Sequence, residues 1–227
     1  MRREYTPEES YIEWLKSIGC MLYSPFIDGT MLNYIDGKQW YNNCPNFTTI
    51  SLVDDGLQIV KSGGNGASSC IQIDTVSRPN LNVGDPTNTA PLTLIVTGKS
   101  NRTVDAYTAF FCDGGGNTNQ QNLPYTTMAY YGLVCLYYAG ITSGNATTWH
   151  TYQGVLDSDS QREYHYRDCS LIHNLNAQRT NQLMEINRNH FGCKLVTNAT
   201  YTIKNCYGFS TALSLADIQK IYQHDNQ

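Results

Sequence analysis

The stretch YTIKNCYGFSTALSLADIQKIY, residues 201–222, decides the fold class of this chain. Its first part alternates apolar and polar residues, as a strand with one buried face does. Its second part carries Ser214 with Asp217 three residues further on, which is a helix N-cap signature. We therefore predict a final strand over 201–209 and a single short helix over 215–223.

Upstream of this stretch the same strand-and-turn rhythm continues back to residue 20. Short runs of β-branched and aromatic residues are separated by clusters of Gly, Pro, Asn and Asp, which is typical of antiparallel strands and their turns. The predicted strands are 20–26, 47–53, 56–61, 70–76, 91–98, 105–112, 126–131, 133–139, 150–156, 163–175, 191–197 and 201–209. This pattern predicts an all-β fold, a two-sheet antiparallel jelly-roll sandwich with a short N-terminal helix and a short C-terminal helix.

The N-terminal helix is predicted from local chemistry. Thr6 can accept a hydrogen bond from the amide of Glu9, and the Glu9 side chain can reach back to the Thr6 amide. Pro7 suits the first helical position because it needs no amide partner there. We expect a helix over 7–17 that ends before Gly19.

The apolar side chains of this helix form only part of one stripe, so two alternatives stay open. The helix either packs on its own domain or docks onto a neighbouring subunit. We assign residues 1–18 to a helical docking segment, with Tyr11, Trp14 and Leu15 as its docking residues, and residues 19–227 to a laminin G-like jelly-roll domain.

Composition excludes two classes of partner. The net charge is −4, charged residues make up only 15% of the chain, and the longest basic cluster is Arg2-Arg3, so nucleic-acid binding is not expected. The longest apolar run, 133–141, is too short to cross a bilayer. No apolar stretch follows the N-terminal arginines, so we expect no secretory leader and synthesis in the cytoplasm.

Eight cysteines are present, and an even number would suit disulfides in a secreted protein. Because no leader is expected and several cysteines have strand-like apolar neighbours, we interpret them as buried free thiols. No Cys-x-x-Cys motif occurs, so a structural zinc site is not expected.

The C-terminal stretch 201–222 resembles the close of laminin G-like domains of the concanavalin A-like lectin/glucanase superfamily. The segment 20–29 resembles their opening strand, and 92–96 resembles the strand that begins their second sheet. The resemblance implies a jelly-roll sandwich and leaves the function open, because this fold hosts many functions. Domains of this kind also occur in bacteriophage structural proteins.

Catalytic members of that superfamily use a Glu-x-Asp-x-x-Glu or similar strand motif for glycoside hydrolysis. Outside the N-terminal segment this chain has only Glu163 and Glu185, and neither belongs to such a motif. We interpret Asp157 and Asp159 as part of a turn. The histidines show no ligand or acid–base spacing, so we predict that the protein is not an enzyme.

We predict no metal and no cofactor, with calcium as the alternative. Asp113 with Asn117 in a glycine-rich loop, or Asp157 with Asp159, could supply the hard oxygen ligands that calcium requires. Loops of acidic residues and glycines are more often plain turns.

Ligand or partner binding is the function class that is left, and the 17 tyrosines of the chain favour it. Tyr and Trp offer rigid amphipathic surfaces for sugars or protein partners. The candidates are the cluster around Trp149, the stretch 125–131 and the pair Trp40-Tyr41. The predicted ligand-binding residues are Trp149, Tyr152, Tyr125, Tyr130, Asp113 and Asn117.

Our first hypothesis is a non-enzymatic virion surface protein of a bacteriophage, such as a capsid-decorating, head-fibre or tail-associated subunit. It would be oligomeric or bound to other virion proteins at the virion surface, with binding of host glycans as a further role. The alternative is a carbohydrate-binding lectin module of a secreted or cell-surface bacterial protein. The second alternative is a divergent glycoside hydrolase.

Overall fold

The computed structural model describes about three fifths of the chain. The described residues are 6–42, 45–46, 48–62, 71–74, 91–101, 109–113, 135–137, 147–157, 160, 162–176, 188–191 and 199–227.

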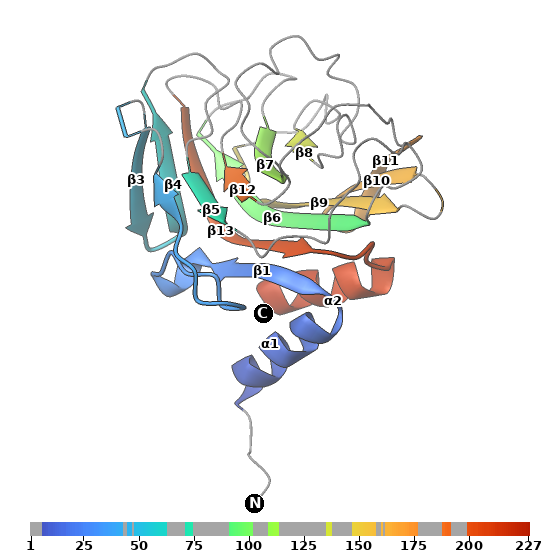
Figure 1. The fold of residues 1–227 in the computed structure, drawn as a ribbon. Helices are drawn as coiled ribbons and strands as arrows, with labels where there is room; N and C mark the ends of the chain where they lie inside the picture. Colours follow the sequence, from blue (N-terminus) through green and yellow to red (C-terminus); the bar gives the residue numbers. More distant parts are fainter. Residues whose placement is uncertain are drawn as a thin grey trace, which may run out of the picture.

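The larger of two antiparallel sheets forms the frame of the molecule (Figure 1). Its eight strands follow the order β11-β10-β9-β6-β13-β4-β3, and β1 pairs with β13 outside this path. The strands are β1 (Cys20–Pro25), β3 (Thr48–Val53), β4 (Gly56–Lys61), β6 (Leu92–Ser100), β9 (His150–Asp157), β10 (Arg162–Arg167), β11 (Ser170–Asn176) and β13 (Ala199–Phe209).

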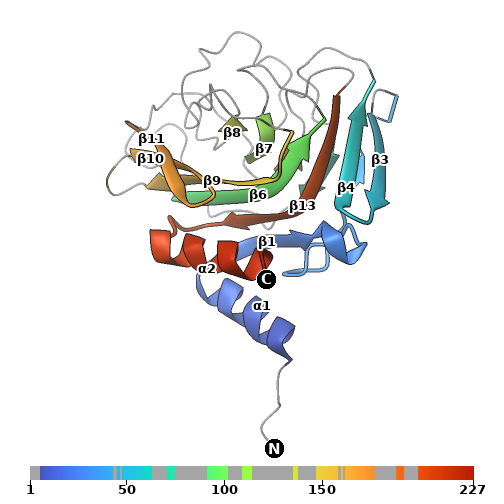
Figure 2. The same ribbon diagram turned by 180° about the vertical axis from the view of Figure 1, so that it is seen from behind.

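The smaller sheet has five short strands in the order β2-β5-β12-β7-β8. They are β2 (Tyr41–Asn42), β5 (Ile71–Asp74), β7 (Ala109–Asp113), β8 (Cys135–Tyr137) and β12 (Arg188–Phe191). Viewed from either side, this sheet lies across one face of the larger sheet, and both helices lie under the other face (Figures 1 and 2). The two-sheet antiparallel sandwich predicted from the sequence, with a short helix at each end, is confirmed.

Both helices begin where their cap residues predict. Helix α1 (Pro7–Ser17) has the complete capping box of Thr6 and Glu9, and helix α2 (Leu215–Asp225) is capped by Ser214, whose hydroxyl accepts from the Asp217 amide. The η1 turn (Phe26–Asp28) follows β1. These caps satisfy amides that a helix N-terminus would otherwise leave unpaired.

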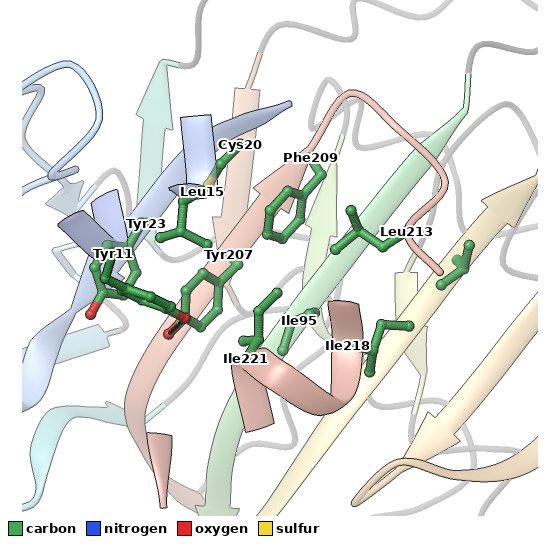
Figure 3. Packing of buried hydrophobic residues seen from close by; sticks show 11 residues of the cluster. Tyr11, Leu15, Cys20, Tyr23, Ile95, Tyr207, Phe209, Leu213, Ile218 and Ile221 are labelled. Carbon is green, nitrogen blue, oxygen red and sulfur yellow. Dashed lines mark hydrogen bonds between the residues drawn. The ribbon is translucent and has the colours of Figure 1, made fainter. Parts of the chain in front are cut away.

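The core below the larger sheet joins the two ends of the chain (Figure 3). Side chains of α1 and α2 meet the outward face of β1, β6, β9 and β13 there. The buried members are Tyr11, Leu15, Cys20, Tyr23, Ile95, Val155, Tyr207, Phe209, Leu213, Ile218 and Ile221. Burial of each large apolar side chain in this cluster contributes about 1.5–3 kcal/mol, so α1 is an integral part of the domain.

The proposed docking role of α1 is therefore corrected. Leu15 is fully buried and Tyr11 is 8% exposed, both within the chain's own core. Trp14 packs against this cluster, and the ammonium of Lys220 on α2 lies 3.8 Å from its ring centroid. The apolar stripe of α1 is already covered, so Tyr11 and Leu15 cannot present a surface to a partner in this arrangement.

The strand predicted over 126–131 lies outside the described residues. Among the described residues, the observed elements differ from the prediction at the hairpin β10–β11 and at β2. The single strand predicted over 163–175 is the hairpin β10–β11, which turns at Asp168 and Cys169. Both turn residues have positive φ, 50° and 63°, as a two-residue type I′ hairpin turn requires. The short strand β2 has no counterpart in the prediction.

Strand β13 changes partners partway along one of its edges. Its residues 199–203 pair with β4, whereas its residues 205–209 pair with β1. On its other edge β6 pairs with both halves, and the register shifts between Ile203 and Asn205. Lys204 thus stands at a branch point of the larger sheet, which is where the candidate site lies.

Candidate functional site

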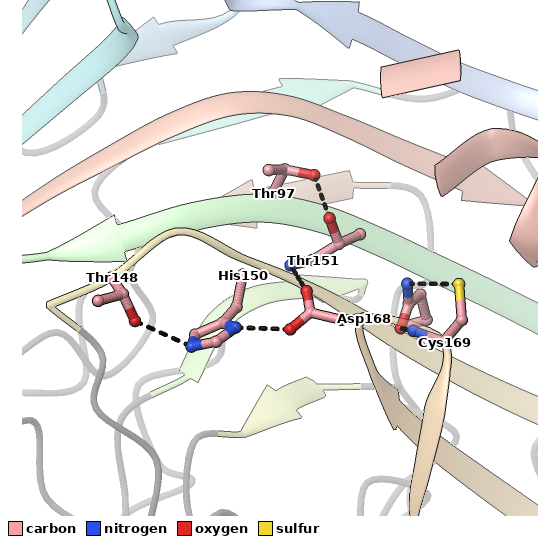
Figure 4. Close-up of polar contacts among 7 residues, drawn as sticks. Thr97, Thr148, His150, Thr151, Asp168 and Cys169 are labelled. Carbon is pink, nitrogen blue, oxygen red and sulfur yellow. Dashed lines mark hydrogen bonds and ion pairs between the residues drawn. The ribbon is translucent and has the colours of Figure 1, made fainter. Parts of the chain in front are cut away.

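The segment that enters β9 places alternate side chains on opposite faces of the larger sheet. Val155 belongs to the core under the helices, so Thr151 and Trp149, at two-residue intervals, lie on that same face. His150 and Tyr152 lie on the face toward the smaller sheet. Figure 4 shows His150 and Thr151 on opposite sides of the strand.

The branch point is held by a close backbone approach. Gly56, at the end of the β3–β4 turn, has φ +123°, and a Cβ placed there would collide with the carbonyl oxygen of Ile203. Only glycine allows both that conformation and that contact. The turn is therefore pressed against β13 beside Lys204, and it brings Asp55 to the same place.

Three side chains converge there, and we call Lys99, Trp149 and Lys204 the Lys–Trp–Lys cluster. The Lys99 ammonium lies 4.4 Å and the Lys204 ammonium 4.6 Å from the centroid of the Trp149 ring. Both distances suit cation–π attraction. Lys99 also forms an ion pair with Asp55, at 3.2 Å between Nζ and Oδ2. All three cluster residues are partly buried.

On the opposite face, His150 is fixed by hydrogen bonds at both ring nitrogens (Figure 4). Its Nδ1 lies 2.6 Å from Oδ2 of Asp168, and its Nε2 lies 3.0 Å from the hydroxyl of Thr148. A carboxylate only accepts, so neutral His150 donates from Nδ1 to Asp168 and accepts from Thr148 at Nε2.

Asp168 performs a second task in the hairpin turn. Its Oδ1 accepts from the Thr151 amide at 2.9 Å, and its own amide donates to the Thr151 carbonyl at 2.8 Å. These bonds tie the left-handed turn to β9. A non-glycine residue in that conformation is disfavoured by about 1 kcal/mol or more, and the bonds offset part of this cost.

The next turn residue, Cys169, offers no reactive thiolate. Burial raises the pKa of its thiol, and the neighbouring Asp168 carboxylate raises it further. The thiol is therefore protonated at neutral pH, whereas nucleophilic cysteines require a lowered pKa. Gln153 lies beside it and accepts from the Cys169 amide at 3.4 Å.

The order hydroxyl, imidazole and carboxylate in Thr148, His150 and Asp168 is also the order of a hydrolase triad. Here the carboxylate holds a strained turn, and the imidazole packs edge-on against Tyr152 at 6.1 Å between ring centroids. We therefore interpret the chain of hydrogen bonds as structural. Within the described ranges, no group of three or more His, Cys, Asp or Glu side chains could hold a metal ion.

Asp157, interpreted from the sequence as part of a turn, is the last residue of β9, and its side chain bonds to Ser160 in the connection to β10. Its carboxylate accepts from the Ser160 hydroxyl at 2.6 Å and from the Ser160 amide at 3.4 Å. Asp159, its predicted companion, lies outside the described residues, as does Glu185. The side chain of Glu163 is not described either, so a pair of facing carboxylates stays untested.

Two predicted aromatic contacts are corrected by burial. Tyr152 is only 5% exposed, because β9 is covered on both faces at that position. Trp40 is 2% exposed, and its indole N–H donates to the Ser24 hydroxyl at 2.9 Å. Both rings belong to the interior, so they cannot present a face to a ligand. Tyr41, the neighbour of Trp40, is exposed.

The remaining predicted site residues stay predictions. Tyr125, Tyr130 and Asn117 lie outside the described residues, and Asp113 is described only as the last backbone position of β7. Trp149 is the one predicted ligand-binding residue that is described and not buried in the interior.

Sequence reasoning missed both lysines of the Lys–Trp–Lys cluster. Lys99 and Lys204 are isolated charges in strands about one hundred residues apart, and no motif links them. Their meeting depends on the register of β6 with β13. The one available signal was that Lys204 interrupts an otherwise uncharged strand.

No protein family model matches the sequence, and no curated protein matches it either. Solved structures do match the fold. A botulinum neurotoxin type C structure, concerned with interaction with two ganglioside molecules, is 11% identical with a TM-score of 0.59, covering 93% of this chain and 53% of that one. The binding domain of botulinum neurotoxin DC in complex with SialylT is 10% identical with a TM-score of 0.57, covering 91% and 52%.

A third match is the same binding domain in complex with rat synaptotagmin II, with 11% identity, a TM-score of 0.57 and coverage of 91% and 52%. The chain thus spans about half the length of these structures. The likeness shows a lectin-like β-sandwich fold. Separately, no helix in the described part of the chain is long and apolar enough to cross a membrane.

Proposed function

We propose that this chain is a non-catalytic binding domain that recognises a glycan at the branch point of its larger sheet. The observation that carries this proposal is the Lys–Trp–Lys cluster, a partly buried indole with two ammonium groups at 4.4 and 4.6 Å. Binding sites combine an aromatic surface with a few fixed polar groups, and this cluster has both.

The fold gives independent support. Two of the three matched toxin structures are binding domains, one of them in complex with SialylT, and the third concerns interaction of the toxin with two ganglioside molecules. At 10–11% identity the likeness is one of fold. A glycan is nonetheless the ligand class that this fold and this cluster favour together.

We further propose that the domain is displayed at a surface, on a bacteriophage virion as a decorating, head-fibre or tail-associated subunit. Its supports are the low charge, the Tyr-rich composition and the resemblance of its ends to laminin G-like domains. The alternative is a lectin module of a secreted bacterial protein. Light scattering separates them, because a virion subunit assembles into oligomers, whereas a simple lectin module remains a monomer that binds sugar.

The test of glycan recognition is a glycan-array screen of the wild type and of Trp149→Ala. The matched control is Trp14→Ala, since Trp14 is also a partly buried indole with a lysine ammonium over it. We expect the wild type and the Trp14 variant to bind the same glycans and the Trp149 variant to lose them. Equal binding by both variants, or no binding by the wild type, contradicts the proposal.

The non-catalytic part has its own test at Thr148. We expect the wild type to hydrolyse neither nitrophenyl glycosides nor nitrophenyl acetate above the buffer rate. Hydrolysis that disappears in Thr148→Ala would show that the Thr148–His150–Asp168 chain is catalytic. Hydrolysis that survives in that variant would indicate another site.

A further inference from the structure

The Lys–Trp–Lys cluster is positively charged in a protein whose overall charge is negative. The net charge of the chain is −4, yet two lysine ammonium groups lie against one indole ring here. Among the described residues, Asp55 is the one carboxylate within ion-pair distance of either ammonium, and it pairs with Lys99. Within the described part of the chain Lys204 contacts only the Trp149 ring, so the described cluster carries one unbalanced positive charge.

The position of Lys204 is set by the backbone. It is the residue at which the β13–β6 register shifts, and Gly56 presses against the carbonyl just before it. Its Cα is thereby held close to the β3–β4 turn, and its stem is directed over Trp149. A cation that is already positioned pays less ordering entropy when a ligand binds.

The ion pair of Lys99 does not close the site. The Asp55 side chain is 59% exposed and the Lys99 side chain 30% exposed, so the pair is well solvated. Exposed pairs of this kind contribute about 1 kcal/mol or less, and an incoming anion can replace the carboxylate. The second ammonium is therefore available to a ligand as well.

Resting on the function proposed above, we propose that the ligand is an anionic glycan whose carboxylate or sulfate group binds between Lys99 and Lys204. The indole of Trp149 holds the two ammonium groups in place by cation–π attraction and is itself only partly buried. A carboxylate and a sulfate ester share the chemistry required, which is a compact anion with several acceptor oxygens. A neutral sugar can accept hydrogen bonds from the ammonium groups but carries no charge to balance theirs.

The experiment measures affinities for three probes, lactose, 3′-sialyllactose and 3′-sulfolactose, alongside the anionic and neutral members of the glycan array. The variants are Lys204→Gln and Asp55→Asn, with Lys220→Gln as the matched control, because Lys220 lies over Trp14 in the same manner. The glutamine keeps most of the length of the lysine and removes its charge.

We expect the acidic probes to bind at least about 10-fold more tightly than lactose. Lys204→Gln should weaken them by roughly 5-fold, Lys220→Gln should leave them unchanged, and Asp55→Asn should strengthen them by roughly 3-fold. Raised salt should weaken binding to the wild type more than to Lys204→Gln. Misfolding cannot raise affinity, so the tighter binding expected for Asp55→Asn tests the proposal even if Lys204→Gln proves unstable.

The outcomes separate this inference from the proposed function. Array hits confined to neutral glycans, or acidic probes that bind Lys204→Gln as tightly as wild type, overturn the anionic site and leave glycan binding intact. An array without any hit overturns both. Preference for sialyllactose over sulfolactose, or the reverse, identifies which of the two anions the site accepts.

Discussion

Replacing Asp225 by asparagine should stabilise the protein relative to the wild type by an amount that grows as the pH rises above about 4. The Asp225 side chain is only 2% exposed at the end of α2. The Tyr207 hydroxyl donates to its Oδ1 at 2.5 Å, and Nδ1 of His224 lies 3.6 Å from the same oxygen. Burial raises the pKa of Asp225 above the ordinary value of 3.8, against the lowering effect of His224 and Tyr207.

The sign follows from which state binds the proton more tightly. The folded pKa lies above the unfolded one, so the stability that Asp225 contributes is full below the unfolded pKa. It is lost as the pH rises through the folded pKa. Asparagine cannot ionise and still accepts from Tyr207. The free energy of unfolding of Asp225→Asn should therefore rise relative to that of the wild type by up to about 1.4 kcal/mol for each pH unit in that window.

The assay is urea unfolding followed by tryptophan fluorescence, between about pH 4 and about pH 8, with exposed Asp54→Asn as control. A further acidic group, Glu8, contacts the same histidine, with its carboxylate 3.9 Å from Nε2 of His224. The His224 ring in turn stacks on Tyr11 at 3.5 Å between centroids. If the wild type instead becomes more stable relative to the variant as the pH rises, the hydrogen-bond partners of Asp225 outweigh its burial, and the predicted sign is wrong.

Three further predictions follow from the packing. Leu15→Ala should lower the free energy of unfolding by about 3–5 kcal/mol, measured in urea, because α1 is part of the core; a loss below about 1 kcal/mol would restore the docking interpretation. Gly56→Ala should cost several kcal/mol, whereas Gly37→Ala, with φ +75° and open space, should cost about 1 kcal/mol. The thiols of Cys20 and Cys206, whose pKa values burial raises, should react with a thiol reagent only in denaturant, and rapid native labelling would contradict their burial.

The elements that the sequence predicts well are those whose cause is local. The caps at Thr6 and Ser214 lie within three residues of their partners, so both helices begin where expected. The long final strand and β6 carry enough apolar residues to be recognised without their neighbours. Local hydrogen bonds and periodicity need no knowledge of the tertiary fold.

The hairpin at Asp168 shows where local reasoning stops. A two-residue hairpin turn is usually recognised in a sequence by a glycine or asparagine, because both turn residues need positive φ. Here Asp168 and Cys169 adopt that conformation, with φ of 50° and 63°. The compensating contacts come from Thr151 and His150 in the preceding strand. Without those contacts the segment reads as one continuous strand.

Burial of the aromatic residues depends on the opposite face of the sheet. Trp149 and Tyr152 looked alike in the sequence, since both belong to one aromatic cluster at the start of a strand. Tyr152 falls on the face toward the smaller sheet at a buried position, whereas Trp149 precedes the strand, on the other face, and is only partly buried. Only the register of β9 with β6 decides between a core residue and a surface residue.

The candidate site arises where the larger sheet cannot remain regular. Strand β13 has two successive partners on one edge, and on its other edge its register with β6 shifts across Lys204. The extra residue is not required for either pairing, so its side chain is released from the sheet pattern, as in a β-bulge. Gly56 allows the acidic β3–β4 turn to lie against Lys204, and the segment that enters β9 places Trp149 beside it. Four segments that are distant in the sequence must therefore come together before both lysines can contact the Trp149 ring. The positive charge of the site thus follows from the strand topology and not from any local sequence motif.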